Sequence, residues 1–154
     1  ITGVSTQISS VDETYQRIKQ QLPTKEDVNG FLSAHQVAIA QLAIEYCSEL
    51  VDSTSLRASF FTDSNFSFTA RSDVAFDSTA KRDAITNPLL DNIMGTTLAI
   101  QPDKETIRTE LNELIDSLET CADCSTDNDF IERTSKVVKG TCTAVLGSAV
   151  MLIQ

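Results

Sequence analysis

The sequence has few glycines and prolines, which make tight turns, and a single histidine. Among its 154 residues are five glycines, three prolines, one histidine and no tryptophan. A small all-β fold would need many tight turns, so this composition argues against one. The single histidine, His35, excludes metal sites built from several histidines, including di-iron bundles, which need two Glu-x-x-His motifs. We therefore expect helices, and we expect neither a metal nor a cofactor.

Basic residues are also scarce, since 12 lysines and arginines face 22 aspartates and glutamates, giving a net charge of −10. An acidic domain without a basic stripe repels phosphate backbones and anionic lipid head groups, so no nucleic-acid partner is expected. The most apolar run, residues 142–153, is short for a bilayer and is interrupted by Thr143, Gly147 and Ser148. A buried helix explains this run better, and membrane insertion is not expected.

The sequence does contain enough apolar residues for one domain, and they follow a helical spacing. A hydrophobic fraction of 41% over 154 residues can form one buried core, so a single domain over residues 1–154 is expected. Apolar residues recur every three or four positions in five stretches. These are residues 10–22, 24–50, 78–95, 102–120 and 126–152. The pattern predicts an all-α fold, an up-down bundle of four to five helices.

Local signals predict where these helices begin and break. Sequences with N-cap spacing start at Ser10, Thr24 and Thr126, and Pro102 opens the fourth helix. The second helix either breaks near Ser53, within a run of poor helix formers, or continues to Phe61. The third is expected to break at Asn87-Pro88, because the residue before a proline disfavours helix. Gly140 and Gly147 would let a neighbouring helix approach the last helix closely.

Residues 62–77 lack a helical period and form either a long loop or a short strand-like segment. Five of the seven phenylalanines lie between residues 60 and 76. In the interpretation that we favour, they pack this Phe-rich loop onto the bundle. In the alternative, Phe66 and Phe68 belong to an aromatic surface that contacts a ligand or partner.

The four cysteines, at positions 47, 121, 124 and 142, carry the most information about chemistry. Covalent haem attachment needs a histidine directly after Cys-x-x-Cys, and Ser125 occupies that position. One zinc cannot bind all four, because Cys142 follows Cys124 by 18 residues, roughly 27 Å along a continuous helix. A redox Cys121-x-x-Cys124 lacks the usual βαβ setting, and no Lys, Arg or His flanks it in the sequence.

Disulfides are the better interpretation, because an even set of cysteines suits an exported protein. In an up-down bundle the second and last helices run antiparallel. If the second helix reaches Phe61, Cys47 lies 14 residues, or roughly 21 Å, from that end of the helix. Thr126 starts the last helix at the same end of the bundle, and Cys142 lies 16 residues, or roughly 24 Å, from it. These heights match. We therefore predict a Cys47–Cys142 disulfide between the helices and a local Cys121–Cys124 disulfide in a connection.

His35 falls on the apolar stripe of the second helix, between Leu32 and Ile39. A lone histidine there is more often a core side chain than a catalyst, so a ligand contact at His35 is kept as the alternative. A Ser-His-Asp triad has no support, since the sequence contains no G-x-S-x-G nucleophile elbow. We expect no enzymatic activity.

Three segments carry a resemblance to a known kind of protein. They are Leu22-Pro23 through Phe31-Leu32-Ser33-Ala34-His35-Gln36, the segment QLAIEYC at 41–47, and VVKGTCTAVL at 137–146. Together they resemble a helical module of large exported bacterial proteins that also carry laminin-G-like jelly-roll domains. The resemblance covers about a third of the chain and implies an envelope or extracellular setting. It implies no activity and no functional residues.

These observations lead to one expected function and one alternative. The chain begins Ile1-Thr2-Gly3 without an initiator methionine, and we expect it to be a segment of a longer protein. We expect a non-enzymatic structural or interaction module of an exported or cell-envelope protein, located in the periplasm, on the cell surface or outside the cell. Its partners would be other domains of the same polypeptide or another envelope protein. The alternative is a small-ligand-binding or redox bundle that uses the His35 region or the Cys121/Cys124 pair.

Overall fold

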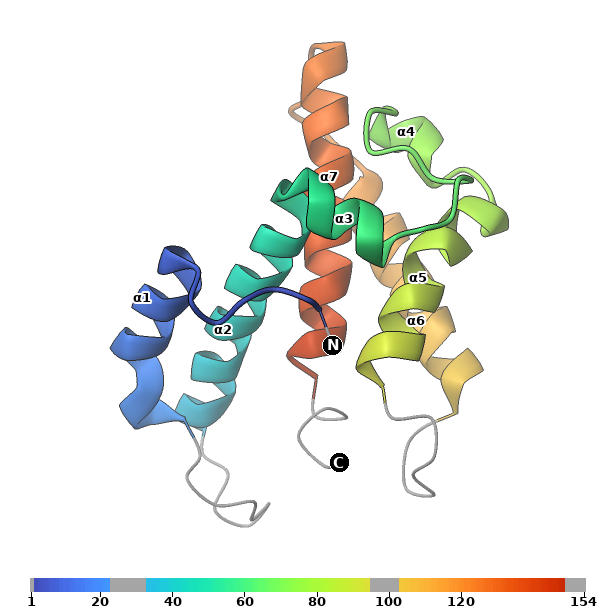
Figure 1. Cartoon of the computed structure of the whole chain (residues 1–154). Helices are drawn as coiled ribbons and strands as arrows, with labels where there is room; N and C mark the ends of the chain where they lie inside the picture. The colour runs from blue at the N-terminus through green and yellow to red at the C-terminus, as the bar shows by residue number, and fades with distance from the viewer. Residues whose placement is uncertain (1, 23–32, 95–102, 149–154) are drawn as a thin grey trace.

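The helical spacing of the sequence is realised along most of the chain (Figure 1). The computed structural model describes residues 2–22, 33–94 and 103–148, which form helices and no strand. The elements are α1 (Ser9–Ile18), the 3-10 helix η1 (Lys19–Gln21), α2 (Ser33–Asp52), α3 (Thr54–Phe60), α4 (Ser72–Ala75), α5 (Thr79–Ile93), α6 (Lys104–Glu119) and α7 (Asp127–Leu146). The all-α prediction is correct. α1, α2, α5, α6 and α7 correspond to the five predicted stretches, whereas the short α3 and α4 are additional.

α2 and α7 run antiparallel through the middle of the molecule, with α1 beside α2 and with α5 and α6 beside α7 (Figure 1). The described residues share one apolar core to which all these helices contribute. Its members include Val11, Cys47, Leu50, Val51, Phe60, Phe76, Ile85, Leu89, Leu90, Ile93, Leu111, Ile115, Val137, Val138, Cys142 and Val145. Burying each of the larger side chains stabilises the fold by about 1.5 to 3 kcal/mol before chain entropy is counted.

α1 begins differently from the prediction. The sequence predicts a cap at Ser10, but Ile8 is the N-cap residue and makes no side-chain capping bond. The Ser10 hydroxyl instead donates to Oε1 of Glu49 on α2 at 2.6 Å. A tertiary hydrogen bond thus takes the place of the local cap and joins α1 to α2.

The second predicted helix breaks at Ser53, so the continuous alternative to Phe61 is wrong. Ser53 has extended backbone angles and caps α3 by accepting from the Leu56 amide. The α3 segment turns away from the axis of α2 (Figure 1). The Arg57 side chain donates to the Val51 carbonyl at 3.2 Å, which satisfies an acceptor at the end of α2.

α5 passes through Pro88 without the predicted break. A proline inside a helix removes one backbone donor and costs about 3 kcal/mol. Two features offset this cost. Leu89 and Leu90, directly after the proline, are buried in the core. Arg108 of α6 donates to the Asn87 side chain at 2.6 Å. Tertiary packing therefore outweighs the local preference.

The last two helices have side-chain caps at their first turns. Asp103 caps α6 by accepting from the amides of Glu105 and Thr106. Thr126 and Asp129 form the capping box predicted for α7. This helix ends at Leu146, with Gly147 as the C-cap, rather than near residue 152. The predicted helix starts at Thr24 and Pro102, and the end of the chain from residue 149, lie outside the described residues.

Candidate functional site

The structure joins the same two cysteine pairs that the sequence predicts. Cys47 of α2 bonds Cys142 of α7, with Cα atoms 5.8 Å apart, and both residues are fully buried. The separation of 95 residues makes this bond a cross-link between distant parts of the chain. Its position in the core between the two longest helices gives it a structural role.

The prediction of this pair compared distances along two helices, and it assumed a wrong length for the second predicted helix. α2 stops at Asp52, so Cys47 lies about one and a half turns from its end, whereas Cys142 lies about four turns into α7. The two cysteines still meet, because the first turns of α7 extend past the end of α2. There, α7 packs against α4 instead (Figure 1).

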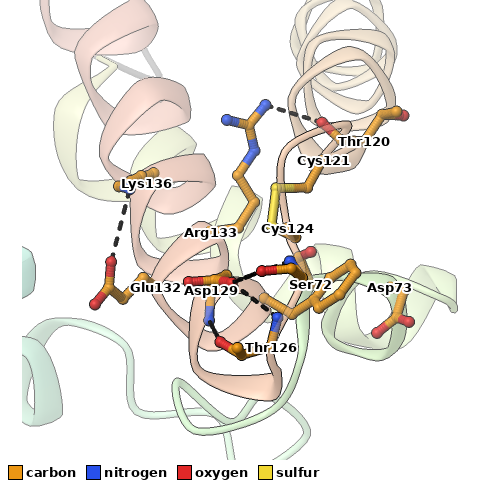
Figure 2. Close-up of a disulfide and its surroundings, with 12 residues drawn as sticks. Ser72, Asp73, Thr120, Cys121, Cys124, Thr126, Asp129, Glu132, Arg133 and Lys136 are labelled. Carbon is orange, nitrogen blue, oxygen red and sulfur yellow. Dashed lines mark hydrogen bonds and ion pairs between the residues drawn. A yellow bond between two sulfur atoms is a disulfide. The ribbon is translucent and has the colours of Figure 1, made fainter.

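The second disulfide lies in the connection between α6 and α7 (Figure 2). Cys121 and Cys124 have Cα atoms 5.4 Å apart, and both residues are partly exposed. Cys121 directly follows Thr120, the C-cap of α6, and Cys124 precedes Thr126, the N-cap of α7. We call residues 120–126 the disulfide loop.

Arg133 of α7 reaches back to the start of the disulfide loop (Figure 2). Its Nε donates to the Leu118 carbonyl at 2.6 Å, and its Nη2 donates to the Thr120 carbonyl at 3.0 Å. The Ser72 hydroxyl donates to the Glu119 carbonyl between them at 3.3 Å. The free carbonyls at the end of α6 are thus satisfied by two other elements. The structure also brings a cation beside a Cys-x-x-Cys that no cation flanks in the sequence.

Asp129 fixes the other end of the disulfide loop. Its carboxylate accepts from the amides of Ser125 and Thr126 at 3.0 Å and 2.8 Å, and the Thr126 hydroxyl accepts in return from the Asp129 amide. The amide of Ser125, followed by the amide and hydroxyl of Thr126, holds the pKa of Asp129 at about 2, below its ordinary value. The carboxylate is therefore charged at neutral pH and bonded to the loop.

The five clustered phenylalanines form one continuous chain of ring contacts. Ring centroids lie 4.9 Å apart for Phe60 and Phe61, 5.7 Å for Phe61 and Phe68, 5.0 Å for Phe66 and Phe68, and 5.3 Å for Phe66 and Phe76. Phe76 is fully buried, and Phe66 and Phe68 are partly buried against the core. These contacts support the packing interpretation. A partner contact at Phe66 and Phe68 stays a prediction.

The Phe-rich loop is fixed to the first turns of α7. The Thr134 hydroxyl donates to the Ala70 carbonyl at 2.8 Å. The Arg71 guanidinium lies 3.9 Å from the centre of the Phe130 ring and pairs with Asp127. The segment contains no strand; it includes the four-residue helix α4, which the sequence did not predict.

His35 lies apart from the disulfide loop, in the first turn of α2, and is partly buried. A groove of about 520 Å³ between the N-terminal segment, α1 and α2 is lined by Val11, Tyr15, Leu42 and Tyr46, among others. A smaller apolar groove, of about 230 Å³, lies between α6 and α7. His35 lines neither groove, and a ligand contact at His35 stays a prediction.

The fold and its two disulfides define a disulfide-cross-linked helical bundle. Over residues 2–22, 33–94 and 103–148, no group of three or more His, Cys, Asp or Glu side chains is placed to hold a metal ion. In the same ranges, no helix has both the length and the apolar character needed to cross a membrane. Comparison with protein-family models, curated proteins and solved structures finds no match to the chain. Function has to be inferred from the residues themselves.

Proposed function

We propose that this chain is a non-enzymatic structural or interaction module of a larger exported or cell-envelope protein. The Cys47–Cys142 disulfide carries the proposal. It is buried at the contact of the two longest helices, where it stabilises the bundle and does no surface chemistry. Disulfides of this kind form and persist in oxidising compartments, which supports a location in the periplasm, at the cell surface or outside the cell.

The charged groups with shifted pKa values make contacts within the bundle, which also supports a structural role. Five groups in the described residues have clearly shifted pKa values, namely Arg71, Asp73, Asp77, Glu119 and Asp129. Asp129 belongs to a helix cap, whereas Arg71 with Asp73 and Lys81 with Asp77 are ion pairs at 2.8 Å. Burial raises the pKa of Glu119, which lies 3.7 Å from Arg82. Each shift thus has a structural cause in the bundle itself.

The surface of α2 supports the interaction part of the proposal. Val37 and Ile44 lie two turns apart on α2 and are 54% and 50% exposed, beside the stripe of Ala43 and Cys47 that is buried against α7. Apolar side chains on a second face of a helix can be covered by a neighbouring domain. The expected partners are other domains of the same polypeptide or another envelope protein. The net charge of −10 disfavours nucleic acid as a partner.

Thiol counting tests this proposal. The chain is produced once with an export signal and once in a reducing cytosol, and each product is alkylated in denaturant without reductant. We expect no free thiol in the exported chain, and a thermal unfolding midpoint that falls when reductant is added. A variant with Cys121→Ser and Cys124→Ser is the control, because it should keep most of this dependence on reductant. Four free thiols in a stably folded exported chain would refute the proposal.

A further inference from the structure

The two disulfides differ in their access to solvent. Cys47 and Cys142 are fully buried, so a thiol can attack their bond only after the bundle opens. Cys121 and Cys124 lie in a surface connection and are partly exposed (Figure 2). A soluble thiol can therefore reach the second bond in the folded state.

The disulfide loop is also held without its sulfur–sulfur bond. Arg133 and Ser72 bind three successive carbonyls at its start, and Asp129 binds two successive amides at its end. A bond that closes a loop between cysteines three residues apart constrains the unfolded chain much less than one that spans 95 residues. Opening Cys121–Cys124 therefore leaves both ends of the loop fixed and the cysteines near each other.

A cation and the start of a helix lie close to these cysteines. The Arg133 guanidinium is bonded to Thr120, the residue before Cys121, and Cys124 precedes the N-terminus of the 20-residue helix α7. A nearby cation and a helix N-terminus both favour the thiolate, the form of cysteine that reacts in disulfide exchange. Acidic groups lie nearby as well: Glu119 is partly buried, Asp129 accepts from the loop amides, and Asp123 and Asp127 are exposed to solvent, which screens their charges.

We propose that Cys121 and Cys124 form a dithiol–disulfide exchange site, which opens and closes while Cys47–Cys142 stays oxidised and the bundle stays folded. The reaction partner is a dithiol. One of its thiolates attacks a sulfur of the Cys121–Cys124 bond, which breaks, and the electron pair leaves on the other cysteine sulfur, which takes up a proton. The second partner thiolate then attacks the partner's own sulfur in the mixed disulfide, and the electron pair leaves on the bound cysteine sulfur, which takes up a proton. The partner ends as a disulfide, and Cys121 and Cys124 end as two thiols.

Differential alkylation of the native chain tests the site, with dithiothreitol as the dithiol. The folded protein is incubated with the reagent, quenched at intervals, alkylated and analysed by peptide mass. We expect Cys121 and Cys124 to be alkylated together, at least about 100-fold faster than Cys47 and Cys142, because the buried pair reacts only when the bundle opens. The helical circular dichroism signal should not change, and oxidised dithiothreitol should restore the bond.

Two results would overturn the proposal. One is reduction of all four cysteines in a single phase; the other is a loss of helical signal when Cys121 and Cys124 alone are reduced. A variant with Cys121→Ser and Cys124→Ser is the matched control and should show no fast phase. The result is separate from the structural proposal above, which depends on Cys47–Cys142 and fails only if that bond is absent.

Discussion

The carboxylate of Asp52 and the ammonium group of Lys139 lie 2.7 Å apart where α2 ends beside α7. About two and a half turns earlier on α2, a Cβ placed on Gly147, the C-cap of α7, would lie 3.6 Å from the Cβ of Ala43. The Cys47–Cys142 bond falls between these contacts. All three contacts agree on one antiparallel register, so the disulfide closes over a helix pair that the other side chains already align.

Removing the buried disulfide should cost much more stability than removing the exposed one. Replacing Cys47 and Cys142 together by alanine is expected to lower the free energy of unfolding by about 4 to 5 kcal/mol, because that bond closes a long loop. Replacing Cys121 and Cys124 by alanine should cost roughly 2 kcal/mol or less. Urea denaturation without reductant measures both. Equal losses of unfolding free energy in the two double variants would contradict a structural role for the buried disulfide and a minor one for the exposed disulfide.

Asp129 makes the stability of α7 depend on acidic pH. Its pKa is about 2 in the folded chain and near 3.8 when unfolded, so its contribution is complete above about pH 4 and is lost as the pH falls towards 2. Asp129→Asn should therefore lower the thermal midpoint at pH 7, and the gap to the parent should shrink by pH 2. Calorimetry of the parent and the variant at both pH values measures this gap in thermal midpoint. A gap that is as large at pH 2 as at pH 7 would show that the charge is not involved.

Truncating a phenylalanine at the buried end of the aromatic cluster should destabilise the fold more than truncating one at its exposed end. Phe76→Ala is expected to cost about 3 to 5 kcal/mol, because Phe76 is fully buried and truncation leaves a cavity. Phe66→Ala, at a partly exposed neighbour 5.3 Å away, should cost clearly less. Chemical denaturation of both variants measures the difference. If Phe66→Ala is the more damaging change, the packing interpretation needs revision.

Arg133→Met should loosen the disulfide loop. The substitution keeps the length of the side chain but removes the donors to the carbonyls of Leu118 and Thr120, at an expected cost of about 1 to 2 kcal/mol. Amide exchange at residues 121–126 should become faster. Lys136→Met is the control, since its pair with Glu132 spans 3.8 Å with both side chains more than 60% exposed. That change should cost less than about 0.5 kcal/mol.

The two faces of α2 should respond differently to truncation. Leu50 is fully buried, so Leu50→Ala is expected to cost about 2 to 5 kcal/mol. Ile44 is 50% exposed, so Ile44→Ala should cost under about 1 kcal/mol in the isolated chain. Thermal unfolding of the two variants provides the test. A large loss at Ile44 would mean that this face is already covered within the chain.

The sequence predicts the longer helices well, because amphipathic spacing and capping are properties of neighbouring residues. The capping box at Thr126 is an example, since all its atoms come from one turn. Pro88 and α4 show the opposite case. The helix through Pro88 persists because Arg108 and the buried leucines hold it. The short helix α4 packs against α7, which is distant in the sequence. Contacts between residues far apart in the sequence leave no pattern among neighbouring residues, so these two features could not be predicted.

The cysteine pairing was predictable, but the surroundings of the second pair were not. Matching distances along two antiparallel helices selected Cys47–Cys142, and the pair is correct although the assumed length of the second helix was wrong. Arg133 is nine residues beyond Cys124, so the sequence gives no sign that it lies beside the start of the same loop. It does so because α7 returns alongside α6, where a side chain on Gly140 would collide with Leu118.

The two ends of α7 are held by different kinds of bond. Near Cys142 a covalent bond ties the helix to α2, whereas near Asp127 it is held by ring contacts, ion pairs and single hydrogen bonds to the Phe-rich loop. A tension applied at the two ends of the chain would pass from residue 47 to residue 142 through the disulfide, so residues 48–141, including the Asp127 end of α7, would carry none of it while the bond is intact. The Cys47–Cys142 bond therefore limits the length of chain that such a tension can extend.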